Sequence, residues 1–343
     1  MIWFDLDNSP HVPIFRPILN ELRKREYKYT ITARDFAQTA ELLRYWKIDN
    51  TIVGRHAGKS KIKKILNLPI RAFQLNKSLK GKKIDLAVSH GSRTQLIMAR
   101  TLGLRSIVMM DYEFTEKFIF NTCATYILIP SLIPISRLKS AGINTRKVIR
   151  YNGFKEELYL SDFIPDPSFK SKIGIENDLL VFIRPPSMVG NYHDSKSETL
   201  LLGIIDHFLD SKNTTILISA RTEHDKHLIN RRFSGNNRVK YLEKVVDGLQ
   251  LLYAADIAIS GGGTMNREAA LLGTDTYSIF TGRRPYLDEY LQGQGKLSFI
   301  ESLKDISLIK TPPKKIKKLP HFSTALCNEV TDIILDIATA KPR

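Results

Sequence analysis

The sequence has few features of exported, disulfide-bonded or membrane-spanning proteins. Its 343 residues include two cysteines, Cys123 and Cys327, which lack the close spacing of a CxxC motif or a zinc finger. The longest apolar runs, such as residues 126–135, are too short and too rich in proline to cross a bilayer. The opening residues MIWFDLDNSP carry acids where a secretory signal needs basic residues. We therefore expect a protein that stays in the cytoplasm and has no transmembrane span.

Acidic residues are also scarce. The chain has 52 Lys and Arg against 35 Asp and Glu, a net charge of +17 that attracts polyanions and anionic surfaces. The excess is concentrated in residues 55–83, where ten Lys or Arg and no Asp or Glu are interspersed with apolar residues, and 310–322 form a second basic run. The segment 55–83 fits either a solvated helix packed on its own domain or a peripheral contact with anionic lipid. Nucleic-acid binding fits less well, because aromatic residues are sparse there and no nucleic-acid-binding motif is present.

Short apolar runs alternate with longer helical patterns, which predicts parallel α/β layers. The expected strands are 2–6, 27–32, 51–53, 85–89, 106–110, 126–129, 147–151, 179–184, 215–219, 239–242, 256–260, 276–280 and 297–300. The expected helices are 14–25, 35–46, 60–79, 93–102, 196–210, 247–254, 264–272 and 322–339.

The length exceeds what one hydrophobic core usually supports, so we expect two domains. We assign a Rossmann-like domain to residues 1–152, a linker to 153–176 and a second Rossmann-like domain to 177–320. Residues 321–343 are expected to form a helix that packs back toward the first domain. Paired domains of this kind bind ligands in the cleft between them, at the carboxyl ends of their strands. Site residues are therefore expected in the loops that follow strands.

One such loop reads GGGT, at residues Gly261, Gly262, Gly263 and Thr264, between an apolar strand and a helix. Glycine lets the backbone approach a ligand closely, and the N-terminus of a helix attracts anions. Glu268, one turn into the helix, is placed to accept hydrogen bonds from the two hydroxyls of a ribose. The loop matches neither GxGxxG nor GxxxxGK[ST]. A sharp turn with Glu268 serving only the helix dipole remains an alternative.

Other strand ends carry polar residues as well. Arg184 follows an apolar strand and precedes two prolines, so it is a candidate phosphate ligand, with a structural salt bridge as the alternative. His11 follows the first strand and is a candidate general base or a loop-packing residue. Asp111 and Glu113, two residues apart, are candidates for proton transfer, or else for helix capping or solvent exposure. His90 lies in the SHGS stretch and ends a strand that points to the same edge.

The run from Ser260 to Gly273 resembles the nucleotide-sugar signature of GT-B enzymes. Glycines follow a strand, an alanine follows the glutamate, and a glycine lies five residues beyond the glutamate. Non-hydrolysing UDP-N-acetylglucosamine 2-epimerases and the N-acetylglucosaminyltransferase of peptidoglycan synthesis share this spacing. Over nearly its whole length the chain also resembles a prokaryotic family of unknown function grouped beside those epimerases. The stretches that carry this second resemblance are DLDNSPHVPIFRPI (5–18), ITARDFAQTAELL (31–43), GRHAGKS (54–60), SHGS (89–92), YNGFKEELYL (151–160) and RPPSMVGNYH (184–193).

These resemblances imply a GT-B type α/β fold, with two Rossmann-like parallel-sheet domains facing a central cleft and the first domain on the acceptor side. They imply that Gly261 to Thr264 bind the diphosphate and Glu268 the ribose of a nucleotide sugar. Arg184 and Ser187 would add phosphate or sugar contacts, and we count His90, Ser92 and His193 as further candidate substrate contacts. Enzymes of this type use a UDP-sugar as substrate without a bound metal or other cofactor, and we expect neither here.

Departures from the epimerase pattern favour a transferase. Where the epimerases have Gly-Asp-Thr after the fourth strand, this chain has Gly91-Ser92-Arg93, and Arg184-Pro185 replaces their His-Arg pair; an acid near Glu113 remains. We therefore expect a glycosyltransferase that transfers sugar from a UDP-sugar to a lipid-linked or glycan acceptor during cell-surface glycan synthesis. Peripheral contact with the inner face of the membrane through 55–83 would suit such an acceptor. An epimerase-like enzyme and a non-catalytic nucleotide-sugar-binding protein are the alternatives.

Overall fold

The computed structural model describes residues 1–36, 38–55, 61–175, 179–186, 195–211, 213–220, 222–244, 246–310, 317 and 319–340, without the side chains of 55, 61–67, 195 and 196. The chain divides into two compact units. The first unit comprises Met1–Asp162 together with Phe322–Arg343, and the second comprises Phe163–His321.

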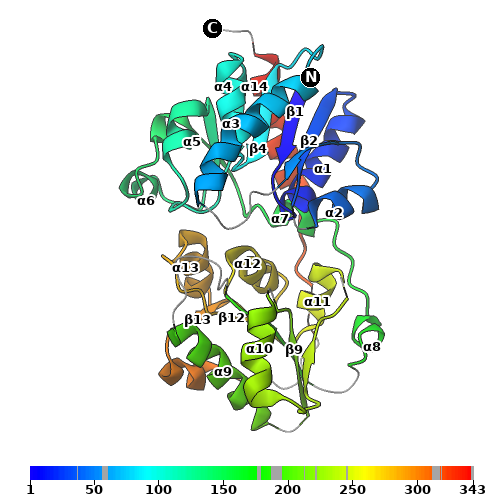
Figure 1. The fold of residues 1–343 in the computed structure, drawn as a ribbon, viewed down its shortest axis with the longest axis vertical. Helices are drawn as coiled ribbons and strands as arrows, with labels where there is room; N and C mark the ends of the chain where they lie inside the picture. The colour runs from blue at the N-terminus through cyan, green and yellow to red at the C-terminus, as the bar shows by residue number, and fades with distance from the viewer. Residues whose placement is uncertain are drawn as a thin grey trace. The chain divides into compact units, whose positions relative to one another are not determined.

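The first unit is built on a seven-stranded sheet in the order β3-β2-β1-β4-β5-β6-β7, in which every pairing is parallel (Figure 1). Its strands are β1 (Ile2–Leu6), β2 (Tyr29–Asp35), β3 (Thr51–Arg55), β4 (Leu86–His90), β5 (Arg105–Met109), β6 (Tyr126–Pro130) and β7 (Val148–Tyr151). Its helices are α1 (His11–Lys24), α2 (Thr39–Tyr45), α3 (Lys61–Ser78), α4 (Arg93–Thr101), α5 (Phe118–Cys123), α6 (Ile135–Ser140), α7 (Glu157–Leu160) and α14 (Ala325–Thr339), with a 3-10 turn at Thr145–Lys147.

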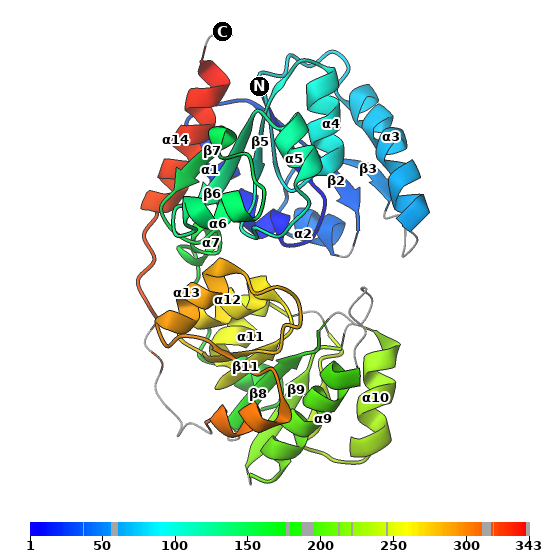
Figure 2. The same cartoon turned by 90° about the vertical axis from the view of Figure 1, so that its left-hand side faces the viewer.

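Strand β1 is central to this sheet, and all five of its residues are buried. Such near-continuous apolar strands are typical of parallel sheets covered by helices on both faces. The C-terminal helix α14 packs against α1 and β7 of the same unit, as Figure 2 shows. Its residues Leu326, Val330 and Ile334 are buried. A helix from the end of the chain thus completes the core of the first unit.

The second unit is built on a six-stranded parallel sheet in the order β10-β9-β8-β11-β12-β13. Its strands are β8 (Leu179–Arg184), β9 (Thr214–Ile218), β10 (Val239–Tyr241), β11 (Ile257–Ser260), β12 (Asp275–Ser278) and β13 (Ser298–Phe299). Its helices are α8 (Phe169–Lys172), α9 (Ser195–Leu209), α10 (Glu223–Phe233), α11 (Gly248–Ala254), α12 (Gly263–Leu271) and α13 (Tyr286–Gly293), with a 3-10 helix at Leu303–Leu308.

In each sheet, the chain adds strands first on one side of the starting strand and then on the other, so the strand order reverses once. The reversal falls between β1 and β4 in the first sheet and between β8 and β11 in the second. Open α/β sheets bind ligands outside the carboxyl ends of the strands at such a switch point. We therefore expect a ligand to bind at the loops that follow β1, β4, β8 and β11.

The structure differs from the expected linker at 153–176. Residues 153–162 fold with the first unit, and Phe154, Lys155, Leu158 and Leu160 are buried there. The remainder belongs to the second unit and contains α8. The sequence of this stretch, with its two prolines and mixed charges, does not predict a buried segment. Its helices are only four residues long, too short to show a helical period.

Several helices have no counterpart among the expected ones. Helices α5 and α6 have six residues each, too few for an apolar repeat to be recognised. Helix α10 is longer and begins with a capping box, in which Thr222 and Asp225 each bond the backbone of the other. The sequence Thr-x-x-Asp was the signal that would have predicted it. Within the described residues, no helix is long and apolar enough to span a membrane.

Candidate functional site

In the second unit, the glycine turn and Arg184 meet at the switch point of the sheet. Arg184, the last residue of β8, lies opposite Ser260, the last residue of β11. The N–H of Gly261 donates to the carbonyl of Arg184 at 3.2 Å, and α12 begins at Gly263. Because the first N–H groups of a helix have no partner within it, this edge presents donors and a positive helix end. Both features suit an anionic ligand.

Gly261 is required by close packing. A Cβ added to it would lie 2.3 Å from the Cα of Pro186, a distance that no real side chain tolerates. The N–H of Gly262 donates to the Ser260 hydroxyl at 3.0 Å, which holds the turn closed. Gly262, Gly263 and Thr264 remain partly exposed. The backbone is therefore both rigid and accessible at the start of α12.

Buried polar residues anchor α12 beneath this turn. The Asn266 amide donates to the carbonyl of Ser260 at 3.2 Å and to the hydroxyl of Ser278 at 3.0 Å. Arg267, only 3% exposed, pairs with the fully buried Asp288 at 2.9 Å. These contacts fix the helix to the ends of β11 and β12 and to α13. The next residue, Glu268, is half-buried and therefore has a defined position.

Arg184 and Glu268 interact electrostatically. Burial lowers the pKa of the Arg184 guanidinium, and the negative charge of Glu268 acts in the opposite direction. Arg184 also donates to the hydroxyl of Ser219 at the end of β9, at 3.3 Å. An arginine keeps its charge under such conditions, since its ordinary pKa lies far above neutral pH. The site therefore combines a fixed positive charge, a helix N-terminus and one carboxylate.

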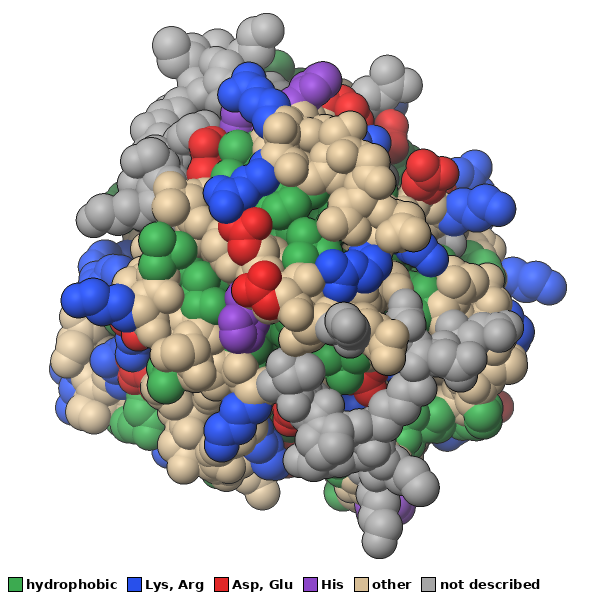
Figure 3. Space-filling view, turned by 90° about the horizontal axis from the view of Figure 1, so that it is seen from below, with side chains coloured by type: hydrophobic (Ala, Val, Ile, Leu, Met, Phe, Trp, Pro, Cys, Tyr) green, Lys and Arg blue, Asp and Glu red, His purple; other side chains and the backbone are tan. Residues whose placement is uncertain are grey.

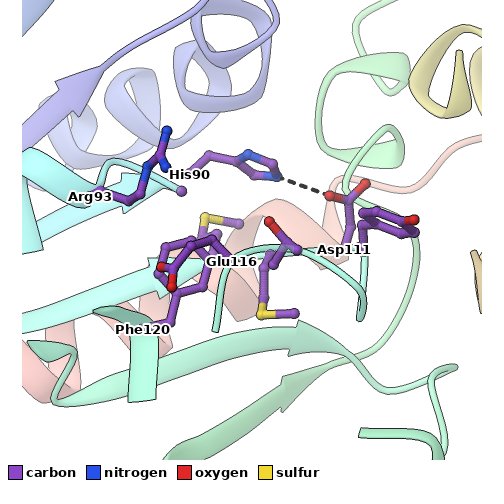
Figure 4. A pocket seen from close by; sticks show the side chains of 10 residues that line it. His90, Arg93, Asp111, Glu116 and Phe120 are labelled. Atoms are coloured by element: carbon purple, nitrogen blue, oxygen red, sulfur yellow. Dashed lines mark ion pairs between the residues drawn. The ribbon is translucent and has the colours of Figure 1, made fainter. Parts of the chain in front are cut away.

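The first unit contains a pocket of about 320 Å³ at the carboxyl ends of β4 and β5. Figure 4 shows His90 and Asp111 pointing toward one another at its edge, with Arg93, Glu116 and Phe120 also lining it. His90 Nε2 lies 3.3 Å from Asp111 Oδ1. A basic ring and a carboxylate thus face a cavity large enough for a small ligand.

His11 lies beside this pocket, at the first position of α1 and not in the loop expected before it. Its ring centroid is 5.2 Å from that of His90. The Asp7 N–H donates to His11 Nδ1 at 3.1 Å. Burial, reinforced by His90, lowers the pKa of His11 well below its usual value. His11 is therefore neutral near pH 7, with its proton on Nε2.

Sequence reasoning missed Lys155, which extends the same cluster from the loop after β7. The side chain is buried, and its ammonium contacts Asp111 Oδ2 and, at 2.9 Å, Glu156 Oε1. Glu156 is completely buried. The signal was the KEE stretch at 155–157, which begins four residues after the end of β7. Residues at or after the ends of β1, β4, β5 and β7 thus bring together His11, His90, Asp111 and Lys155, of which His90 is partly exposed and the other three are buried.

The other candidates of the first unit have structural partners. Glu113 is fully buried and paired with Arg137 Nε at 2.8 Å, and it does not line the pocket. Ser92 is also fully buried; its hydroxyl donates to Asp5 at 2.5 Å and caps α4. Glu116, a neighbouring acid, accepts hydrogen bonds from the first N–H groups of α5. Ser187 and His193 lie outside the described residues.

A buried ion-pair network underlies the loop that holds His11. Arg71 of α3, 1% exposed, makes two hydrogen bonds to the fully buried Asp5, of 2.9 and 2.8 Å, and approaches Asp7 Oδ1 at 2.9 Å. Burial works against the charge of Asp5, but its contacts with Arg71 hold its pKa below the usual value. Burial and the charge of Asp5 raise the pKa of Asp7 to about 6. One arginine of the basic segment is thus an internal residue that fixes the end of β1.

Among the described residues, no group of three or more His, Cys, Asp or Glu side chains is placed to hold a metal ion.

Comparison with known families identifies the chain as a member of the family described as "Protein of unknown function (DUF354)", whose model matches residues 1–339. A relative, "Uncharacterized protein MJ0665" of Methanocaldococcus jannaschii, is 27% identical over 312 residues, which cover 89% of each chain. The predicted resemblance to a family of unknown function is therefore confirmed.

Solved structures with a similar fold include UDP-GlcNAc 2-epimerases. That of Neisseria meningitidis, bound to UDP-GlcNAc, has a TM-score of 0.77 at 14% identity and covers 98% of this chain and 99% of its own. That of Methanocaldococcus jannaschii, in complex with UDP-GlcNAc and UDP, has a TM-score of 0.75 at 14% identity, covering 97% and 99%. Anabaena Alr3699/HepE, in complex with UDP and glucose, has a TM-score of 0.55 at 16% identity, covering 98% and 92%. The predicted GT-B-like pair of parallel α/β domains is confirmed.

Proposed function

We propose that this protein is a glycosyltransferase that binds a UDP-sugar at the glycine turn of its second unit. The observation that carries the proposal is the meeting of Arg184 with Gly261–Gly263 at the switch point of the second sheet. The diphosphate would lie at the N-terminus of α12, next to Arg184, and Glu268 would accept hydrogen bonds from the ribose. The structural neighbours solved with UDP or UDP-GlcNAc support this choice of nucleotide.

Sugar transfer requires stabilisation of the departing nucleoside diphosphate. When an acceptor hydroxyl attacks the anomeric carbon, the new C–O bond forms as the bond to the diphosphate breaks. The diphosphate leaves with the electron pair, and the hydroxyl proton passes to a base. Negative charge grows on the diphosphate, where a fixed guanidinium and a helix N-terminus provide preorganised stabilisation. Transfer to a glycan or lipid-linked acceptor in cell-surface glycan synthesis would use this reaction.

Isothermal titration calorimetry tests the binding step. UDP and UDP-N-acetylglucosamine should bind to the wild type, ADP should bind more weakly, and Glu268→Ala should weaken UDP binding. Absence of binding of any nucleotide by the folded protein would reject both a transferase and an epimerase. Release of UDP that depends on an added acceptor would then establish transfer.

An epimerase-like enzyme is the second candidate, and the buried cluster of the first unit favours it. Epimerisation by elimination and re-addition of UDP needs several acid and base groups around the sugar, and His90, Asp111 and Lys155 lie together. Ser92 occupies the position at which the epimerases carry an aspartate. Its hydroxyl donates to Asp5, and it provides no carboxylate for catalysis. Incubation of UDP-N-acetylglucosamine in D₂O separates the candidates, because an epimerase incorporates deuterium at C2 of the sugar.

A peripheral membrane contact would serve a lipid-linked acceptor, and α3 is the element that suggests it. Ile70 and Phe73 of this helix are 54% and 70% exposed. Lys77, Lys80 and Lys83 nearby are also exposed. Exposed apolar side chains flanked by lysines bind anionic bilayers, with each cation near the surface contributing about 1 kcal/mol.

A nucleic-acid partner receives less support. On the face of the molecule in Figure 3, Lys and Arg side chains are interspersed with acidic and hydrophobic ones and form no continuous basic surface. Arg71, one of the ten cations in 55–83, is internal. Electrostatic binding to a phosphate backbone depends on clustered exposed cations.

A further inference from the structure

The two neighbouring histidines of the first unit have different hydrogen-bonding environments. His11 accepts the Asp7 N–H on Nδ1, so its proton lies on Nε2. His90 turns Nε2 toward Asp111 Oδ1 at 3.3 Å, an ion-pair contact without hydrogen-bond geometry. Because the negative charge of a carboxylate attracts the positive end of an N–H dipole, we infer that the proton of the neutral ring lies on Nε2 and the lone pair on Nδ1. The rings lie 5.2 Å apart and carry their protons on the same nitrogen, but the Nδ1 lone pair of His11 already accepts the Asp7 N–H.

Asp111 is held in place to orient His90. Its second oxygen, Oδ2, contacts the Lys155 ammonium, which is also bonded to Glu156 at 2.9 Å. Lys155 is 2% exposed, so its charge is poorly screened by solvent. The carboxylate therefore has one oxygen fixed by a lysine and the other directed at His90. A base oriented by a third group is a recurrent arrangement at catalytic sites.

The pocket beside His90 suits a hydroxylated ligand. Its volume is about 320 Å³, and its lining combines Arg93, Tyr112 and Thr115 with the apolar side chains of Met109 and Phe120. Arg93 is exposed at the first position of α4, where it is available to an anionic group such as a phosphate or carboxylate. An apolar wall and a few polar groups are typical of carbohydrate and other small-molecule sites.

We propose that His90, oriented by Asp111, is the group that receives a proton from a hydroxyl of a carbohydrate ligand bound in this pocket, and that His11 is not. The hydroxyl proton moves to His90 Nδ1 while its electron pair stays on the oxygen, which becomes the nucleophile. Asp111 faces the resulting imidazolium and stabilises its charge. This inference rests on the proposed function, since it supplies the base that sugar transfer requires. His11, buried and neutral, offers an N–H donor instead.

Nitrogen-15 NMR of histidine-labelled protein tests the assignment without a substrate. The wild type should show His90 and His11 both protonated on Nε2. Asp111→Asn should change the tautomer balance of His90 and leave His11 unchanged. The matched control is Glu198→Gln, which removes the carboxylate from an exposed pair with His224 in the second unit and should not affect His90. A wild-type His90 protonated on Nδ1 would overturn the proposal.

Kinetics of His90→Gln provide the second test. Loss of a general base should lower kcat about 10²- to 10⁴-fold while the Kd for UDP stays unchanged. Wild-type turnover by this variant would overturn the role of His90. The two proposals fail separately: absence of UDP binding rejects the nucleotide-sugar function, whereas the NMR result decides the His90–Asp111 arrangement in either case.

Discussion

Arg184 and Ser260 lie opposite one another at the ends of the two strands that flank the switch point of the second sheet. This pairing brings Arg184 next to a glycine turn that is more than seventy residues away in sequence, and its guanidinium interacts with Glu268. Under the proposed function, the cation that the turn lacks in the form of a lysine is supplied by Arg184 from another strand.

Glu268→Ala should weaken UDP binding by about 1.5–3 kcal/mol, or roughly 10- to 100-fold, because it removes hydrogen bonds to a charged acceptor. Calorimetry at fixed ionic strength measures the effect. Glu223→Ala, which changes a 77% exposed glutamate on α10, is the matched control and should bind UDP as the wild type does. Equal affinity of the Glu268 variant and the wild type would exclude the ribose role.

Gly261→Ala should destabilise the second unit by about 1–3 kcal/mol, since its Cβ would overlap with the backbone of Pro186. Urea denaturation measures the loss. The control is Gly293→Ala at the end of α13, where an added Cβ meets nothing within 4 Å. That variant should be as stable as the wild type or more so. If both variants behave alike, the turn is not closely packed.

Arg71→Leu should cost about 3–5 kcal/mol, because it leaves the buried Asp5 without its cation. Lys24→Ala removes a 75% exposed lysine paired with Glu21 and should change stability by less than about 0.5 kcal/mol. Denaturant midpoints compare the two. A mild effect of Arg71→Leu would show that the buried Arg71–Asp5 pair contributes little to stability.

The raised pKa of Asp7, about 6 against an ordinary 3.8, predicts a pH dependence. The folded protein holds this proton more tightly than the unfolded chain, so its stabilising contribution is complete below pH 3.8 and is lost as the pH rises through 6. Asp7→Asn removes this pH-dependent loss of stability. The variant should therefore gain stability relative to the wild type, on the order of 2 kcal/mol, between pH 4 and pH 7. A difference between the two proteins that is constant over this range would contradict the prediction.

Phe73→Ser should reduce sedimentation with vesicles containing anionic lipid, because it removes an exposed apolar side chain beside the lysines of α3. Phe118→Ser is the matched control, since Phe118 is 73% exposed on α5 and carries no such basic surroundings in the sequence. Binding of both variants at the wild-type level would remove the membrane contact from the proposed function.

Much of the fold was predictable because strands of a parallel sheet are short, apolar and separated by helices. Strands β1 and β8 have the bounds expected from sequence, and α3 differs from its expected range by one residue at each end. The first-unit site was less accessible to sequence reasoning. Lys155 and Arg71 contact partners 44 and 66 residues away, and no local period reveals such a pairing. The tautomer of His11 depends on a hydrogen bond from the Asp7 backbone N–H, and residue type alone does not specify this contact.

Helix α14 has a consequence for how the chain is made. The second unit is one continuous stretch, so it can fold as soon as it has left the ribosome. The first unit is interrupted: its sheet is synthesised before the second unit, and the α14 side chains that cover α1 are added after it. For most of translation, the apolar face of α1 is without its covering helix. A nascent chain truncated before residue 325 would therefore be a substrate for chaperones, even though the whole sheet and both site loops were already present.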